Sequence, residues 1–292
     1  MINLKIILIL FLTTISLILN PHTPKDQEDW QPLFNGENLD GWETYLAKPD
    51  KSLDVGGLPR NADGTYKEPY GVNNDPLDVF SVLTKDGEPA IRISGKVFGA
   101  LTSKDSWKNY HLQLQFKWGE NQWPPRKNAK RDTGLLYYAF GEHGGADHSW
   151  MKSQEFQIQH TDVGDYWGVG GGAMDIPAKK TSDNETYIYD PQAATISFGE
   201  GLEAGRRCKK AADYEKPHGH WNTLDLYAYG DTAVHVVNGH PVMVLHNSRY
   251  IGDGQNHPLT EGRIQLQSEG AEVYYRRIKI KQIDKIPDKF LE

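Results

Sequence analysis

The sequence MKSQEFQIQHTDVGDYW, residues 151–167, contains a strictly alternating segment. Polar side chains at Glu155, Gln157 and Gln159 are separated by single apolar residues. Successive side chains of a β-strand point to opposite faces, so we expect the three polar groups on one face and the apolar ones in a core. The segment therefore predicts a half-buried strand that carries one carboxylate and two amides in a row.

Similar segments recur along the chain and indicate an all-β protein. Further strands are expected at Val79–Leu83, Ala90–Ser94, Phe98–Thr102, Tyr110–Trp118, Gly134–Phe140, Thr195–Phe198, Trp221–Tyr229, Ala233–Val237, Pro241–Leu245, Arg263–Gln267 and Glu272–Lys281. The dipeptide Asn238-Gly239 predicts a hairpin turn between two of them. Residues 48–74 and 175–219 are expected to be mostly irregular. The pattern predicts a β-sandwich or jelly roll with long loops.

The N-terminus has the pattern of an export signal. Lys5 precedes an apolar run over residues 6–19, which is short for a membrane span of about 20 residues. We expect a signal peptide at residues 1–20, a linker at 21–31 and one domain at 32–292, with an uncleaved membrane anchor as the alternative. Cys208 is the single cysteine, so an intramolecular disulfide is impossible, and a bacterial periplasm is the favoured location.

Charge and motif content exclude several classes of function. The formal net charge of −7 argues against nucleic acid as a partner, because phosphate backbones are bound by clustered Lys and Arg. The sequence has no HExxH, no Walker loop and no GxSxG. The remaining groups are acids, amides, histidines and aromatics, and the 8 Trp and 15 Tyr are compatible with stacking on sugars.

The alternating strand and the loop after it suggest a sugar-binding cleft. Amides both donate and accept hydrogen bonds, which suits them to sugar hydroxyls. The strand is followed by His160, several aspartates, Trp167 and a glycine run. An ordinary polar outer face of a sandwich is the alternative for this segment.

A second polar row has the same spacing. Gln265, Gln267 and Glu269 alternate with apolar residues in the segment RIQLQSEG. If both rows belong to one sheet, they would line a concave groove with donors and acceptors for hydroxyls. Two unrelated exposed strand faces would give the same pattern.

Asp132 is a further candidate for chemistry. It directly follows Lys130 and Arg131. We expect these cations to lower the pKa of its carboxyl and keep it ionised. Alternatively, Asp132 caps the turn before the next strand.

The histidines do not match a known metal pattern. His143, His148, His160 and Asp165 could in principle form a site, but their spacing corresponds to no metal-binding signature. We assign no metal ligand and no cofactor from the sequence, and a divalent metal remains open.

Several motifs together resemble one family. They are LFNGENLDGW, RDTGLLYY, SQEFQIQ with DVGDYW, VVNG and GRIQLQSEGAEVYYRRIKI, in this order from residue 31 to the C-terminus. Their number and order are similar to the 3-keto-disaccharide hydrolase domain family. The resemblance implies an exported bacterial protein with a concanavalin-like jelly roll, and an oxidised carbohydrate as the substrate.

The resemblance also implies a reaction. A ketone at C3 acidifies the C2 proton, so the group on C1 can leave by elimination, and water can then add to the enone. Such a reaction needs a base, donors to the ketone and an acid for the leaving group. Glu155 is the first candidate for the base, or else binds ring hydroxyls, and His160 is a candidate proton donor or second base. Candidates to polarise the ketone are Lys96, Lys130 and Arg131.

Two other functions stay open at this point. A carbohydrate-binding module without catalysis would use the same amide-rich groove. A retaining glucanase on this fold would need two carboxylates about 5 to 5.5 Å apart. Glu155 has no second acid on its own strand face, which disfavours the glucanase.

Overall fold

A computed structural model describes residues 30–183 and 186–291. The predicted signal peptide and most of the predicted linker lie outside the described residues. Residues 31–292 form one compact unit. Within the described ranges, no helix has the length and apolar character needed to cross a membrane.

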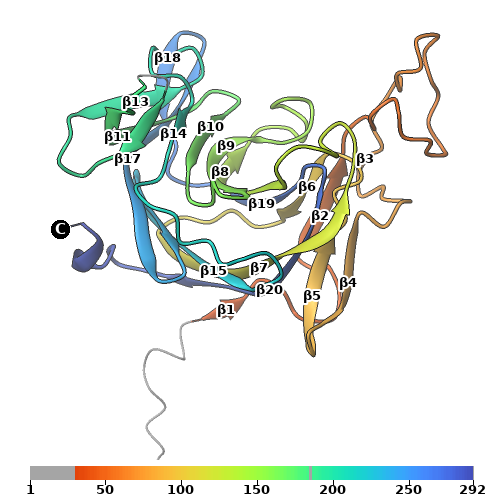
Figure 1. The fold of residues 1–292 in the computed structure, drawn as a ribbon, viewed down its shortest axis with the longest axis horizontal. Helices are drawn as coiled ribbons and strands as arrows, with labels where there is room; N and C mark the ends of the chain where they lie inside the picture. Colours follow the sequence, from red (N-terminus) through yellow and green to blue (C-terminus); the bar gives the residue numbers. More distant parts are fainter. Residues whose placement is uncertain (1–29, 184–185, 292) are drawn as a thin grey trace, which may run out of the picture. The chain divides into compact units, whose positions relative to one another are not determined.

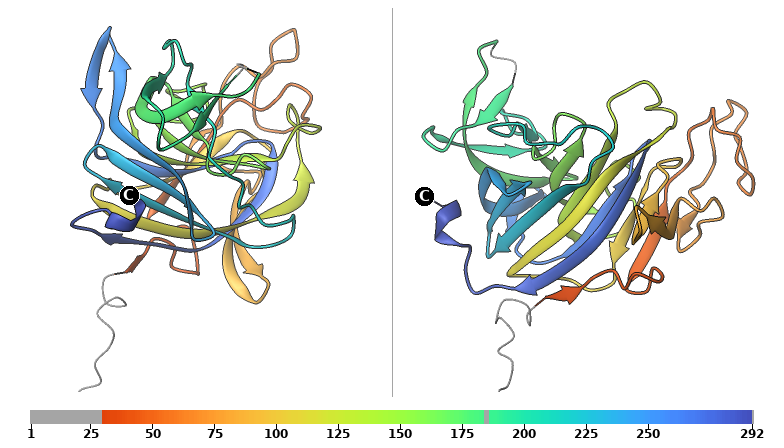
Figure 2. Two further views of the ribbon diagram at one scale, coloured as in Figure 1. Left: turned by 60° about the vertical axis from the view of Figure 1, so that its left-hand side comes forward. Right: turned by 60° about the horizontal axis from the view of Figure 1, so that its bottom comes forward.

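The unit is built from two antiparallel sheets, as Figures 1 and 2 show. The 12-stranded sheet contains β1 (Gln31–Pro32), β4 (Phe80–Lys85), β5 (Glu88–Ile93), β7 (Tyr110–Gln122), β11 (Gly172–Lys180), β12 (Tyr187–Tyr189), β13 (Thr195–Gly199), β15 (Asn222–Tyr229), β16 (Thr232–Val237), β17 (His240–Gly252), β18 (Gln255–Pro258) and β20 (Ala271–Gln282). The 8-stranded sheet contains β2 (Trp42–Leu46), β3 (Gly71–Val72), β6 (Gly99–Ser103), β8 (Asp132–Phe140), β9 (Lys152–Gln159), β10 (Tyr166–Val169), β14 (Arg207–Cys208) and β19 (Arg263–Ser268). A short 3₁₀ helix, η1, spans Asp288–Phe290. The predicted all-β, concanavalin-like jelly-roll sandwich is confirmed.

The core lies between the sheets because alternate side chains of each strand point inward. Leu112, Leu114 and Phe116 of β7 are fully buried, and so are Phe156 and Ile158 of β9. All five belong to one hydrophobic cluster. Burying a side chain of this size stabilises a fold by about 1.5–3 kcal/mol. The polar residues that alternate with them are therefore directed to the outer faces.

Turn chemistry sets the register of the hairpin between β16 and β17. Asn238 and Gly239 have φ values of 51° and 84°, and Val237 pairs with His240 across them. Positive φ at both turn positions defines the type I′ turn that Asn-Gly favours. The hairpin predicted from this dipeptide is confirmed.

The prediction was wrong for part of the segment from residue 175 to 219. Most of β11 and all of β12 lie there, and β11 pairs with both β13 and β17. β11 carries Pro177, Lys179 and Lys180, which obscure the alternation, and β12 is only three residues long. Their structure depends on partners distant in the chain, which local propensity does not reveal.

The strand order brings the two polar rows together. The 8-stranded sheet runs β14-β10-β9-β8-β19-β6-β2-β3, so a single strand, β8, separates β9 from β19. Gly134 of β8 pairs with Gln157 of β9, and Leu136 of β8 pairs with Glu155 and with Gln265 of β19. Polar side chains from both rows thus lie on one face of one sheet.

Candidate functional site

A hollow of about 190 Å³ lies on this face, and we call it the central hollow. Strands β8, β9, β10 and β19 form its base, and residues of four loops form its rim. It is lined by Arg126, Asp132, Asp147, Trp150, Glu155, Gln157, Gln159, Trp167, Val169, Arg206, Gln267 and Glu269. Seven of these twelve residues were candidates from the sequence alone.

The floor of the central hollow exists because residue 134 is glycine. A Cβ atom at Gly134 would lie 2.3 Å from Oε1 of Glu155 and 2.3 Å from Oε1 of Gln267. Any side chain on β8 at this point would fill the space that the two polar groups occupy. The glycine lets side chains from β9 and β19 meet across the strand between them.

Arg126 connects the acids on one side of the hollow. Its guanidinium forms an ion pair with Oδ2 of Asp132, and its Nη1 lies 3.6 Å from Oε1 of Glu269. The side-chain amide of Gln159 donates to the same Oδ2 of Asp132. Oδ1 of Asp132 is buried and has no partner among the described residues. One oxygen of this carboxylate is therefore held by two side chains, and the other is left without a hydrogen bond from the described residues.

Burial raises the pKa of Asp132 to about 7, although Arg126 and Gln159 act in the opposite direction. The expectation that Lys130 and Arg131 keep this carboxyl ionised by lowering its pKa was wrong. Desolvation is the largest effect, and the cation in contact is Arg126. A carboxyl with this pKa can take up or release a proton near neutral pH.

Two further acids in the hollow, Glu155 and Glu269, have raised pKa values as well. The pKa of Glu155 is raised well above its usual value, first by burial and then by the charge of Asp132. The pKa of Glu269 is raised for the same reasons and by Glu155 as well. Within the described part of the chain, no hydrogen bond holds the Glu155 carboxyl. Burial thus favours the protonated forms of these carboxyls, and a site with three such groups has candidates for both a base and an acid.

Several buried polar atoms of lining residues have no partner in the part of the chain that the structure describes. They are Nε of Arg126, Oδ1 of Asp132, Nε1 of Trp167 and Oε1 of Gln267. Buried polar groups are normally hydrogen-bonded, so four such atoms around one hollow indicate a place for a polar ligand. Two are donors and two are acceptors, which matches a ligand with both kinds of group.

Three candidates from the sequence lie outside the central hollow. Nδ1 of His160 faces Oε1 of Glu215 at 3.4 Å, and its ring is directed to that loop. Lys130 donates to Oγ1 of Thr161 at 2.7 Å and to Asp162 at 3.0 Å. Arg131 is half-buried and does not line the hollow.

Two further candidates are placed elsewhere. Gln265 is fully buried, and its amide is occupied: Oε1 accepts from the backbone N–H of Met151 at 3.0 Å, and Nε2 donates to Oγ1 of Thr102 at 2.8 Å. Lys96 lines a second, larger hollow that is described below. Of the second row, only Gln267 and Glu269 line the central hollow.

Sequence reasoning missed the loop residues of the rim. Arg126, Asp147, Trp150 and Arg206 come from segments without a periodic pattern. Arg126 lies in a conspicuous basic loop, Trp123–Arg131, but nothing in that run distinguishes it from the neighbouring cations. The other acids of the hollow come from outside β9, so the absence of a second acid on the Glu155 strand face did not show that the site lacks a second carboxyl.

Three of the four residues considered for a metal site pair with other side chains, and His148 lines the second hollow. His143 faces Glu43 at 3.4 Å and stacks on Tyr45, while Asp165 accepts from Arg207 at 2.6 Å. Across residues 30–183 and 186–291, no group of three or more acidic, histidine or cysteine side chains has an arrangement that could hold a metal ion.

Comparison with solved structures finds distant likenesses. A provisionally named glycosyl hydrolase from Parabacteroides distasonis ATCC 8503 is 16% identical, with 89% of this chain and 96% of that chain covered and a TM-score of 0.46. A second protein of the same description from that bacterium is 17% identical, with 87% and 99% covered and a TM-score of 0.45. The carbohydrate binding module CBM66 from Bacillus subtilis is 10% identical, with 70% and 92% covered and a TM-score of 0.40. These values are too low to transfer a function, and no curated protein matches the chain.

The sequence itself gives a clearer result. The 3-keto-alpha-glucoside-1,2-lyase-like domain matches residues 29–281, a span that contains every residue of the central hollow. This match confirms the resemblance inferred from the motifs. The chain therefore belongs to the 3-keto-alpha-glucoside-1,2-lyase-like domain family.

Proposed function

We propose that the central hollow cleaves 3-keto-glycosides by elimination followed by hydration. Family membership supports 3-keto-glycosides as the substrate class, and the residues of the hollow offer a chemistry that fits it. The observation that carries the proposal is Asp132, a buried carboxyl with a pKa of about 7 and one unpaired oxygen.

In the first step, Oδ1 of Asp132 takes the proton from C2 of the sugar. The electron pair of that C–H bond forms the C1=C2 double bond, and the C1–O bond breaks. The leaving oxygen receives a proton from Glu155 or Glu269, whose raised pKa values keep them neutral. In the second step, water adds to C1 and a proton returns to C2, so the net reaction is hydrolysis.

Developing negative charge on the ketone oxygen needs hydrogen-bond donors. The unpaired Nε1 of Trp167 and Nε of Arg126 are such donors in the hollow. We assign them this role in place of Lys130 and Arg131. We also change the role of Glu155: its high pKa suits proton donation better than the part of base.

The test is a comparison of an aryl 3-keto-glucoside with the matching plain glucoside in D₂O. Elimination and rehydration should release the alcohol from the keto sugar only and place deuterium at C2 of the product. A reaction without enzyme corrects for spontaneous exchange beside the ketone. Release from the plain glucoside alone would contradict the mechanism and favour an ordinary acid–base glycosidase.

A carbohydrate-binding module is the alternative, because the amides of Gln157 and Gln159 would also hold a sugar that is not cleaved. Glu155→Gln separates the two functions, since the change is nearly isosteric. An enzyme should lose about 10²- to 10⁴-fold in kcat while binding changes within a few-fold. Full activity of this variant would remove Glu155 from the reaction.

A further inference from the structure

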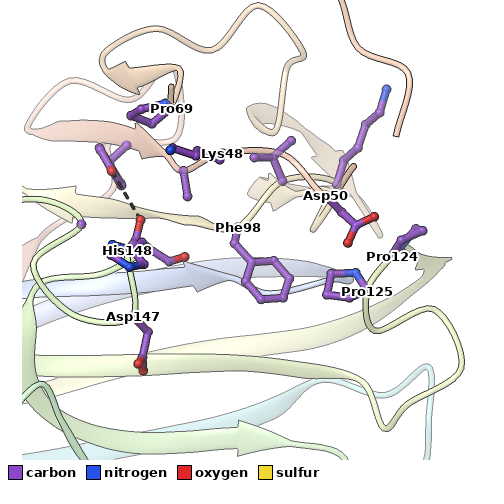
Figure 3. A pocket seen from close by; sticks show the side chains of 14 residues that line it. Lys48, Asp50, Pro69, Phe98, Pro124, Pro125, Asp147 and His148 are labelled. Atoms are coloured by element: carbon purple, nitrogen blue, oxygen red, sulfur yellow. Dashed lines mark hydrogen bonds between the residues drawn. The ribbon is translucent and has the colours of Figure 1, made fainter. Parts of the chain in front are cut away.

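A second hollow of about 420 Å³ lies beside the central one. Figure 3 shows labelled side chains around it, with the ring of Phe98 next to Pro125. Its apolar lining comes from Tyr45, Ala47, Pro69, Val97, Phe98, Pro124 and Pro125. We call it the apolar pocket.

The two hollows share a wall. Phe98 lines the apolar pocket, Trp150 lines the central hollow, and their rings stack with centroids 6.1 Å apart and planes 24° apart. Nε1 of Trp150 donates to the backbone oxygen of Gly99 at 3.0 Å, which fixes the indole in this wall. Asp147 lines both hollows.

One loop also borders both hollows. Pro124 and Pro125 face the apolar pocket, and the next residue, Arg126, faces the central hollow. The shared loop, the shared Asp147 and the stacked wall make the pockets neighbours. A group attached to a sugar in the central hollow therefore has the apolar pocket within reach.

The linings of the two hollows differ in chemistry. Amides and carboxyls dominate the central hollow, whereas prolines, Phe98 and Val97 dominate the other. The charged residues that line the apolar pocket are Lys48, Asp50, Lys96 and Asp147. Nζ of Lys96 lies 5.4 Å from the ring centroid of Trp123. A second sugar ring would leave many hydroxyls facing apolar carbon, which is unfavourable when they lose their water. A flat apolar group would bury its surface without that cost.

We propose that the apolar pocket binds the leaving group, and that the preferred substrates are 3-keto-glycosides of planar aromatic alcohols. This inference rests on the proposed function. The proposed function does not specify the leaving group, and this inference does.

The first experiment measures binding without catalysis, by calorimetric titration of 2-naphthol into the wild-type protein. Phe98→Ala should weaken binding at least fivefold, because the aromatic wall is lost. Pro69→Asp, at a half-exposed position, should do the same by placing a charge in the pocket. Phe290→Ala is the matched control, since Phe290 packs on Tyr227 of the other sheet and should leave binding unchanged.

The second experiment compares turnover of 3-keto-glucosides that carry 2-naphthol, phenol or glucose as leaving groups. The naphthyl compound should have a kcat/KM about tenfold above the phenyl compound, from its additional apolar surface. Pro69→Asp should remove this advantage. A higher kcat/KM for the glucose compound than for both aryl compounds would overturn the inference and leave the proposed function intact.

The binding data can also support the apolar pocket when the proposed cleavage of 3-keto-glycosides fails. Naphthol binding that is weakened by both pocket variants, without turnover of any 3-keto-glycoside, would refute the proposed function and leave a site for aromatic alcohols. Undetectable naphthol binding, or binding that neither pocket variant weakens, would refute the apolar pocket as its site.

Discussion

Glu155 and Gln267 come from strands that do not touch, yet their Oε1 atoms approach one point above Gly134 of the strand between them. The central hollow is deep at this point because Gly134 has no side chain. The positions of the Glu155 and Gln267 side chains therefore both depend on Gly134.

Gly134→Ala should lower kcat/KM by about 10²-fold, because the new Cβ would displace both Glu155 and Gln267. Overpacking should also reduce the free energy of unfolding by about 1–3 kcal/mol. Kinetics and urea denaturation measure the two effects. Gly56→Ala is the control, since a Cβ there would meet no atom within 4 Å. Equal activity of both variants would show that the floor tolerates a methyl group.

Asp132 should give the acid limb of the pH profile. If it is the base, kcat/KM rises about tenfold per pH unit below pH 7 and levels off above it, because only the ionised form accepts the C2 proton. Asp132→Asn should lower kcat by about 10²- to 10⁴-fold. A profile that is flat between pH 5 and 8 would exclude Asp132 as the base.

Arg126 should determine the pH at which the acid limb of kcat/KM occurs. Its charge opposes the effect of burial on Asp132 and on Glu269. Arg126→Met should therefore move the acid limb of kcat/KM to higher pH, whereas Arg126→Lys keeps the charge and should restore part of the difference. A simple loss of rate with an unmoved limb would mean that Arg126 only positions the substrate.

The contribution of Asp132 to stability should decrease as the pH rises from about 4 to about 7. Asp132 binds its proton more tightly in the folded protein, where its pKa is about 7, than in the unfolded chain, where a carboxyl has a pKa of about 4. Between these values the folded state carries more protons, so each rise in pH favours unfolding. Asp132→Asn should flatten this dependence. Urea denaturation of both proteins at pH 5 and pH 8 tests it: the stability of the wild type relative to Asp132→Asn should fall over this interval, and an unchanged difference would contradict the assignment.

The sequence contained the architecture of the site but only part of its chemistry. Alternation places Glu155 and Gln267 on strand faces, because a two-residue period is a local property. The same pattern made Gln265 equivalent to Gln267, although the backbone of Met151 occupies its amide. That difference depends on strand pairing and on a loop, and neither has a signature in the sequence.

The pKa values of the acids in the hollow were even harder to predict from the sequence. Asp132 has two cations before it in sequence, and its pKa nevertheless rises because the fold buries it. Desolvation is a property of the whole surrounding structure, and charge order along the chain does not report it. For the same reason Arg126 was not distinguishable from the other cations of its loop.

The loop that carries Pro125 and Arg126 has a consequence for product inhibition. Arg126 directly follows Pro125, so a shift of the proline would be transmitted through the backbone to the residue whose guanidinium pairs with Asp132. In the proposed mechanism, an alcohol retained in the apolar pocket would then change the basicity of the Asp132 carboxylate. Inhibition by the released alcohol is then expected to vary with pH. Inhibition by a molecule that only blocks access to the apolar pocket should not.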